Sequence, residues 1–272
     1  MECMQAGEGG RDQTRRHKRT TGNVQNPVGR SRPAIDRSNR VRRIFVRVLA
    51  VFATGCAALA LPSPPAHASP VPVYPGMEIR QDANLCTLGY VEPNLRIAVT
   101  AGHCRGSGAV TDRDGNYIGT LAMYRDNTPN GTTVSTNDTI TDYEGINLAV
   151  DSVPTNVLPG GHPLVSDPGF TITPGRAVCH FGVATHETCG TVEAVYNGWF
   201  TMTSGVLSQK GDSGGPVYVN TDDGKAVLVG VFNSTWGDFP AAVTWNAIRQ
   251  QISEDVNAPS APVQRAAWPL NP

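Results

Sequence analysis

Turn signals recur along the chain at short intervals and limit each regular element to a few residues. They combine Gly, Pro, Asn and Asp, which supply the backbone conformations of tight turns, and they stand at 114–116, 130–131, 159–161, 174–175 and 222–224. Between them lie runs of strand length. Residues 96–100 alternate as a half-buried strand does, and residues 226–232 are continuously apolar. The pattern predicts an all-β protein, either a sandwich or a barrel.

One helix is expected near the C-terminal end. Trp245, Ile248, Ile252 and Val256 fall on one face at helical spacing. From Asn257 the chain is rich in Pro and Ala, and we expect a flexible tail over 257–272.

Charge is unevenly distributed. Residues 1–68 hold 12 of the 22 Lys and Arg residues but only 4 of the 23 Asp and Glu residues. Residues 69–272 therefore hold 10 basic and 19 acidic side chains, a net charge of −9. A body of this composition offers no basic patch that could hold phosphates, so we expect no nucleic-acid partner.

The basic leader has the form of an export signal. Arg42-Arg43 precedes an apolar run from Val48 to Leu61, and Ala66-His67-Ala68 is a small-x-small cleavage pattern. The run is about fourteen residues, short of the roughly twenty that span a bilayer. We predict that residues 1–68 are a basic extension and signal peptide, removed near Ala68 to give a secreted or cell-envelope protein without a stable membrane span. Twin-arginine export, or a lipoprotein signal at Cys56, are the alternatives.

The cysteines agree with export. Four of the six stand in the body, at Cys86, Cys104, Cys179 and Cys189, and they allow three pairings. Disulfides persist only in an oxidising compartment. Zinc-ligand spacing is absent, so we expect no metal site and no cofactor.

Two short motifs carry the chemistry. Residues 211–216 read Gly-Asp-Ser-Gly-Gly-Pro, and residues 100–104 read Thr-Ala-Gly-His-Cys. Together they resemble the trypsin-like serine endopeptidases, in particular their bacterial streptogrisin and α-lytic branch. A serine hydroxyl needs a base and donors for the oxygen that becomes negative. The resemblance implies Ser213 as nucleophile, His103 as base, and the amides of Gly211 and Ser213 as oxyanion hole.

The resemblance also implies the architecture. It predicts two packed six-stranded antiparallel β-barrels with a C-terminal helix, over 69–160 for the barrel carrying His103 and over 161–256 for the barrel carrying Ser213. It implies the disulfides Cys86–Cys104 and Cys179–Cys189. It further implies an internal arginine as partner of Asp212, for which Arg176 is the candidate.

The acid of the triad has two possible registers. In the family an Asp begins a strand and is followed at the fourth and sixth positions by apolar side chains, a pattern that Asp142, with Ile146 and Leu148, fits. The competing register places Asn147 where many relatives have the Asp. We favour Asp142.

The family's substrate pocket maps onto Leu207, Lys210, Asn233, Ser234 and Thr235. No carboxylate stands six residues before Ser213, where Leu207 is found, so a preference for Arg or Lys side chains is not expected. The predicted function is a monomeric secreted serine endopeptidase that cleaves protein or peptide substrates. The alternative is a catalytically silent protease-like domain that binds a protein or cell-envelope partner.

Overall fold

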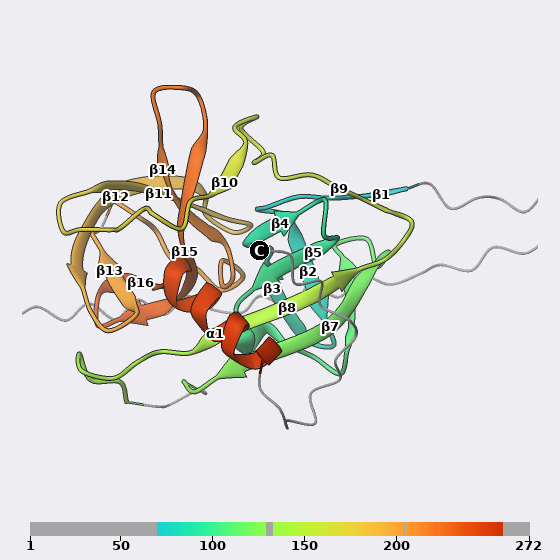
Figure 1. The fold of residues 1–272 in the computed structure, drawn as a ribbon, viewed down its shortest axis with the longest axis horizontal. Coiled ribbons are helices and arrows are strands. Elements are labelled where there is room, and N and C mark those ends of the chain that lie inside the picture. The colour runs from blue at the N-terminus through green and yellow to red at the C-terminus, as the bar shows by residue number, and fades with distance from the viewer. Residues whose placement is uncertain (1–69, 129–132, 204, 258–272) are drawn as a thin grey trace, which may run out of the picture. The chain divides into compact units, whose positions relative to one another are not determined.

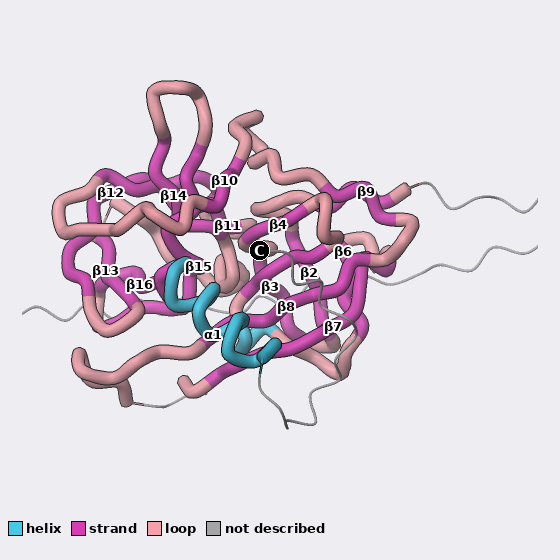
Figure 2. Tube along the Cα trace, viewed as in Figure 1, coloured by secondary structure: helices cyan, strands magenta, loops and turns pink. Residues whose placement is uncertain are grey.

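The computed structural model describes residues 70–128, 133–203 and 205–257. All of them belong to one compact unit. The predictions for the leader, for the turn at 130–131 and for the tail after Asn257 fall outside the described residues. Figures 1 and 2 show that strands dominate the described part of the chain.

The first sheet carries His103 and uses residues 78–148. Its strand order is β3-β2-β6-β7-β8-β5-β4, and every neighbouring pair is antiparallel. The strands are β2 (Glu78–Gln81), β3 (Asn84–Thr87), β4 (Tyr90–Glu92), β5 (Ile97–Thr100), β6 (Ala109–Asp112), β7 (Tyr117–Asp126) and β8 (Asp142–Leu148). A short 3-10 helix, η1 (Gly102–Cys104), follows β5.

The two edge strands of this sheet, β3 and β4, are halves of one bent segment. Only Leu88 and Gly89 separate them: the amide of Leu88 donates to Met77 O on the β2 side, and the amide of Gly89 donates to Val99 O of β5. The segment thus passes from one edge of the sheet to the other. Counted as one strand, it makes the predicted six strands and curls the sheet round on itself.

The second sheet carries Ser213 and uses residues 164–244. Its order is β10-β15-β14-β11-β12-β13-β16, and β15 also pairs with β16, so six of its seven strands close into a barrel. The additional strand, β10, pairs in parallel with β15. The strands are β10 (Leu164–Ser166), β11 (Ala177–Gly182), β12 (His186–Val195), β13 (Trp199–Met202), β14 (Pro216–Asn220), β15 (Ala226–Trp236) and β16 (Phe239–Thr244).

Two further features complete the fold. β1 (Val71–Val73) and β9 (Ser152–Pro154) form a separate parallel pair. The helix α1 (Trp245–Asn257) follows β16, with Trp245 and Ile248 buried and Ile252 and Val256 partly buried against the core. The predicted all-β fold with two barrels and a C-terminal helix is confirmed.

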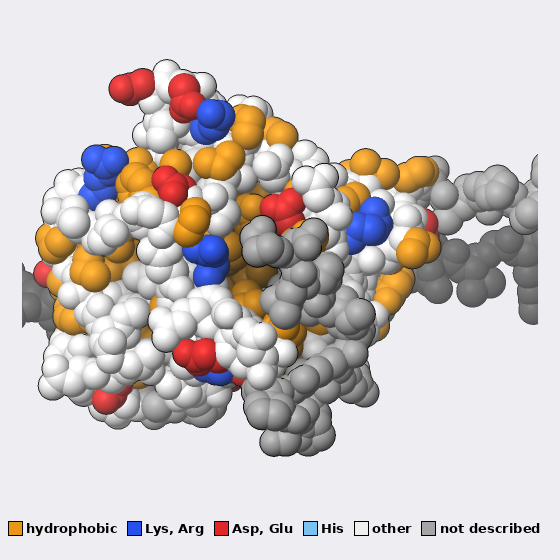
Figure 3. Space-filling view, viewed as in Figure 1, with side chains coloured by type: hydrophobic (Ala, Val, Ile, Leu, Met, Phe, Trp, Pro, Cys, Tyr) orange, Lys and Arg blue, Asp and Glu red, His pale blue; other side chains and the backbone are white. Residues whose placement is uncertain are grey.

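The surface is mixed in charge. On the face seen in Figure 3, Lys and Arg side chains lie singly among polar and apolar groups, and the projecting hairpin between β14 and β15 carries both signs. No described helix is long and apolar enough to cross a membrane.

Candidate active site

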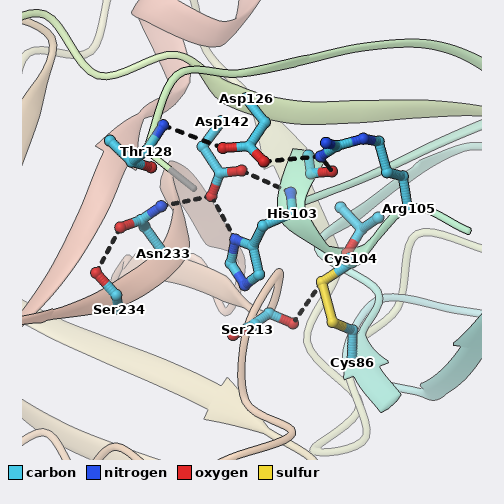
Figure 4. A network of polar contacts seen from close by, with 12 residues as sticks. Cys86, His103, Cys104, Arg105, Asp126, Thr128, Asp142, Ser213, Asn233 and Ser234 are labelled. Atoms are coloured by element: carbon cyan, nitrogen blue, oxygen red, sulfur yellow. Dashed lines mark hydrogen bonds and ion pairs between the residues drawn. A yellow bond between two sulfur atoms is a disulfide. The ribbon is translucent and has the colours of Figure 1, made fainter. Parts of the chain in front are cut away.

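His103 contacts Asp142 within the first barrel, and Asn233 of the second barrel contacts the same carboxylate (Figure 4). The η1 turn places His103 directly after β5, and Asp142 is the first residue of β8. The carboxylate of Asp142 is buried and accepts two bonds from His103: the backbone amide donates to Oδ1 at 2.8 Å, and ring atom Nδ1 lies 2.8 Å from Oδ2. Asp142, and not Asn147, therefore lies against the imidazole.

This contact sets the tautomer of His103. A carboxylate only accepts, so Nδ1 carries the proton and Nε2 presents its lone pair on the opposite edge of the ring. Burial by itself lowers the pKa of His103, but the hydrogen bond and the negative charge of Asp142 outweigh burial, and the pKa lies above its ordinary value of 6.5. The contact with Asp142 therefore stabilises the imidazolium form of His103.

Asn233 extends the network from the second barrel. Its Nδ2 donates to Asp142 Oδ2, and its Oδ1 accepts from the Ser234 hydroxyl at 2.6 Å. Asn233 is buried, whereas Ser234 is exposed. The two residues were predicted to line the substrate pocket; the structure gives Asn233 a second contact, with the acid beneath His103.

Ser213 lies on the side of the imidazole away from Asp142 (Figure 4). Ser213 and His103 line one pocket, but among the described residues no hydrogen bond joins the Ser213 hydroxyl to the His103 ring. Such bonds are often long without substrate and tighten when it binds. The arrangement thus presents a hydroxyl beside a nitrogen lone pair.

The backbone around Ser213 combines a glycine of positive φ with two amides that have no acceptor among the described residues. Gly211 has φ +107°, a conformation that L side chains rarely adopt. The amides of Asp212, Gly214 and Gly215 donate to backbone carbonyls. Those of Gly211 and Ser213 have no acceptor within the described part of the chain, so these two donors are open to a ligand.

Thr87, at the end of β3 in the first barrel, holds this loop. Its amide donates to Ser213 O at 2.8 Å, and its hydroxyl donates to Gly211 O at 2.8 Å while it accepts from the Val183 amide at 3.0 Å. Both carbonyls are thereby drawn toward β3. No motif in the sequence pointed to Thr87, although it directly follows Cys86.

Asp212 has different partners from the one expected. Its buried carboxylate accepts from Ala184, Thr185 and Gln209. The expected partner, Arg176, is exposed and lies over the Phe170 ring, with 5.4 Å between its guanidinium carbon and the ring centroid. Arg176 follows the turn at 174–175 and stays at the surface, so the prediction for Arg176 was wrong.

The pocket beside Ser213 and His103 has a volume of about 410 Å³. Of the predicted pocket residues, Lys210, Asn233, Ser234 and Thr235 line it, whereas Leu207 does not and exposes 51% of its surface. The lining residues that the sequence did not indicate are mostly apolar; they include Val134, Ile140, Trp199, Phe232 and Trp236.

Two tryptophans fix the apolar wall of this pocket. Trp199 Nε1 donates to Asp138 O at 3.1 Å, and Trp236 Nε1 donates to Val134 O at 3.3 Å. The bonds tie the segment before β8 to the second barrel. This wall crosses between the barrels, and for that reason no local pattern in the sequence identified it.

Glu144 lies two residues beyond Asp142 on β8 and is also buried. Gln81 Nε2 donates to its Oε2 at 2.7 Å, but Oε1 has no partner among the described residues. Burial raises the pKa of Glu144 to about 8 against the opposing effects of Gln81 and Arg105. Burial therefore favours the neutral form of Glu144 at pH 7.

Both predicted disulfides are present. Cys86–Cys104 joins β3 to η1, which carries His103, and Cys179–Cys189 crosses the β11–β12 hairpin. In the described residues, the two groups with the geometry of a metal site, Cys86-His103-Cys104 and Cys179-Glu187-Cys189, are built on these disulfide cysteines and offer no thiolate.

Comparison with known proteins identifies two relatives from Mycobacterium tuberculosis. The uncharacterized protein MT1863 of strain CDC 1551 / Oshkosh and the uncharacterized protein Rv1815 of strain ATCC 25618 / H37Rv are each 61% identical to the chain over 216 residues. The match covers 79% of this chain and 96% of each relative. The chain belongs to their family. No family model matches it.

The solved structures that are similar to this chain include two proteases. Thermobifida fusca protease A is 21% identical, with a TM-score of 0.48, over 67% of this chain and 97% of the other. Cellulomonas bogoriensis chymotrypsin is 22% identical, with a TM-score of 0.47, over 67% and 96%. The chain, a member of the family of MT1863 and Rv1815, folds into two β-barrels.

Proposed function

We propose that the protein is a serine endopeptidase that hydrolyses peptide bonds through an acyl-enzyme on Ser213. One observation supports this above all: the buried Asp142 fixes the His103 tautomer that leaves Nε2 free on the side of Ser213. A structural histidine would need no such arrangement beside a serine and two free amides.

The reaction follows from the positions of the groups. His103 Nε2 takes the proton as Ser213 Oγ attacks the peptide carbonyl, and the Gly211 and Ser213 amides bind the oxyanion. Asp142 stabilises the imidazolium through the bond to Nδ1. His103 then returns the proton to the leaving amine, and water releases the acyl group by the same steps in reverse.

The pocket supports a neutral side chain next to the cleaved bond. Lys210 is the one Lys, Arg, Asp or Glu residue among those that line it, and the rest of the lining is aromatic, aliphatic or uncharged polar. A cationic substrate side chain would find no carboxylate there and would meet Lys210 at the edge. We propose protein or peptide substrates that do not carry Arg or Lys at this position.

We further propose that the protein acts as a monomer outside the cytoplasm, after loss of its leader near Ala68. The two disulfides support an oxidising compartment. The leader pattern in the sequence supports export by a cleaved signal.

A fluorophosphonate probe tests the activity directly, because it reacts only with an activated serine. We expect the full-length chain with intact disulfides to be labelled, and Ser213→Ala to remain unlabelled. The folded state of each sample is checked by circular dichroism. A folded wild-type protein that takes no label would contradict the proposal and favour the silent binding domain.

A further inference from the structure

Asp212 stands between the two amides of the oxyanion hole, and its side chain is fully buried. A buried carboxylate is costly unless its oxygens are bonded. Oδ1 accepts from the amides of Ala184 at 2.9 Å and Thr185 at 3.1 Å. Oδ2 accepts from the Thr185 hydroxyl at 2.9 Å and the Gln209 amide at 2.8 Å. Four donors fill the usual capacity of a carboxylate.

These four hydrogen-bond donors serve Asp212 in place of a cationic partner. Among the described residues no ion pair includes Asp212. The titratable base beside it, His180, is itself fully buried, and burial lowers the pKa of His180 to about 4 despite the attraction of Asp212. His180 is therefore neutral near pH 7, and the charge of Asp212 is balanced by hydrogen-bond donors alone.

The carboxylate also closes the oxyanion loop. Gln209 donates its amide to Asp212 Oδ2, and Asp212 donates its own amide to Gln209 O at 3.1 Å. The two bonds join the ends of residues 209–212, the loop in which Gly211 has its positive φ. The direction of the Gly211 amide thus depends on where the Asp212 carboxylate is held.

The turn after β11 fits this carboxylate closely. A Cβ atom on Gly182 would lie 2.1 Å from Asp212 Oδ1, so only glycine lets the backbone pass. Thr185 then supplies two of the four donors, one from its backbone and one from its side chain. It is the one residue of the turn whose side chain bonds Asp212.

We propose that Thr185 is the positioning residue that holds Asp212 and the oxyanion loop in working shape. This inference rests on the proposed function of Ser213. Thr185 does not touch a reacting atom; it acts through Asp212. Loss of its hydroxyl removes one bond to a buried charge and leaves the shape of the side chain intact.

The experiment compares Thr185→Val with Thr185→Ser in the full chain by rate of fluorophosphonate labelling. A bond to a charged group is worth about 1.5–3 kcal/mol, so we expect labelling to slow about ten- to hundredfold in the valine variant. The serine variant keeps the hydroxyl and should recover most of the rate. The half-point of the pH profile, set by His103, should stay unchanged in both.

The NMR resonance of the Gly211 amide is followed in the same samples. It should shift or broaden in Thr185→Val and not in Thr185→Ser, whether or not the protein takes label. A folded wild type without label would therefore contradict the proposed function but not this inference. Equal labelling rates together with an unchanged Gly211 resonance in Thr185→Val would overturn the inference.

Discussion

The two barrels build their halves of the candidate site from different materials. The first barrel contributes ionisable side chains: His103 and Asp142 are joined by two hydrogen bonds, with Glu144 buried beside them. The second barrel contributes backbone: the amides of Gly211 and Ser213 are aimed by a loop whose carbonyls and carboxylate are bonded away from the pocket. The protonation of side chains therefore determines what the first barrel's half of the site can do, and the backbone geometry of a loop determines what the second barrel's half can do.

This difference predicts two classes of variant. Changes around His103 should alter both the rate and its pH dependence, because they act on a titrating group. Changes around Ser213 should alter the rate alone, because the amides do not titrate. The predictions below use labelling by a fluorophosphonate, measured against pH, to separate the two classes.

Asp142→Asn should have the largest effect. An amide in this position can hold the imidazole in the tautomer whose Nε2 carries the proton, and the comparable change in the Ser-His-Asp template lowers turnover about 10⁴-fold. The lower labelling rate should be accompanied by a change in its pH dependence. Wild-type labelling should decline on acidification through a pKa of His103 above 6.5, and that pKa should be lower in the variant because the carboxylate that raises it is gone.

Asn147→Ala is the matched control on the same strand. Asn147 is on β8, but it is not hydrogen-bonded to His103 in the described structure. We expect labelling within about twofold of wild type. Two results would refute the assignment of His103 as base and Asp142 as its partner. One is a wild-type labelling rate that does not change between pH 5 and 8; the other is a loss of labelling in Asn147→Ala as large as that in Asp142→Asn.

The second largest effect is expected for Glu144→Gln. It should change the free energy of unfolding, but only at higher pH. The pKa of Glu144 is about 8 in the folded protein and near 4.5 in the unfolded chain. Below pH 4.5 both states hold the proton, and nothing is lost. As the pH rises to 8 only the unfolded state ionises, so the wild type loses up to about 3–5 kcal/mol of unfolding free energy. The glutamine variant should escape this loss.

Urea unfolding at pH 4 and pH 8.5 measures the difference. The two proteins should be similar at pH 4, and the variant should be the more stable at pH 8.5. Since Gln81 can still donate to the new amide oxygen, the existing bond is retained. A stability difference that is the same at both pH values would mean that Glu144 is not kept neutral by burial.

Thr87→Val tests the second half. It removes the bond to Gly211 O and the acceptor of the Val183 amide, while the backbone bond to Ser213 remains. We expect labelling to slow about ten- to hundredfold, since a buried group left unbonded costs about 1–3 kcal/mol. The half-point of the pH profile should not move. Thr87→Ser, which keeps the hydroxyl, should stay close to wild type, and a moved half-point would break the distinction between the halves.

The sequence was informative where function demands particular residues in a short span. The motifs at 100–104 and 211–216 located His103, Ser213 and the loop amides, and the apolar spacing after Asp142 selected it over Asn147 as the residue that contacts His103. The helical period placed α1 to within a residue of its observed end. Both disulfides followed from the family resemblance and not from spacing.

What the sequence did not indicate is held by contacts between distant segments. Thr87 bonds a loop more than a hundred positions later, and Trp199 and Trp236 reach back to the segment before β8. Asp212 was assigned to an arginine because the family resemblance implies an internal arginine there, whereas three backbone amides and the Thr185 hydroxyl fill its capacity here. Neutral donors leave no signature in composition.

The smallest effect is expected at a contact that joins the barrels away from the site. Arg125 of β7 makes two bonds with Asp255 of α1, at 2.9 and 2.7 Å, and one with Glu254 at 3.0 Å. Tyr143, next to Asp142, also donates to Asp255. The side chain of Arg125 is 29% exposed, so solvent screens the pair, and Arg125→Met should lower the unfolding free energy by about 1 kcal/mol.

Labelling should change by less than about twofold in Arg125→Met, because Thr87–Ser213 and Asn233–Asp142 still fix one half of the site against the other. The exposed pair Lys225–Asp223 provides the matched control: Lys225→Met should alter neither stability nor labelling measurably. A tenfold loss of labelling in Arg125→Met at unchanged stability would instead show that α1 positions Asp142 through Tyr143. The candidate site would then have three contributors: the titrating side chains of the first barrel, the loop backbone of the second barrel, and α1.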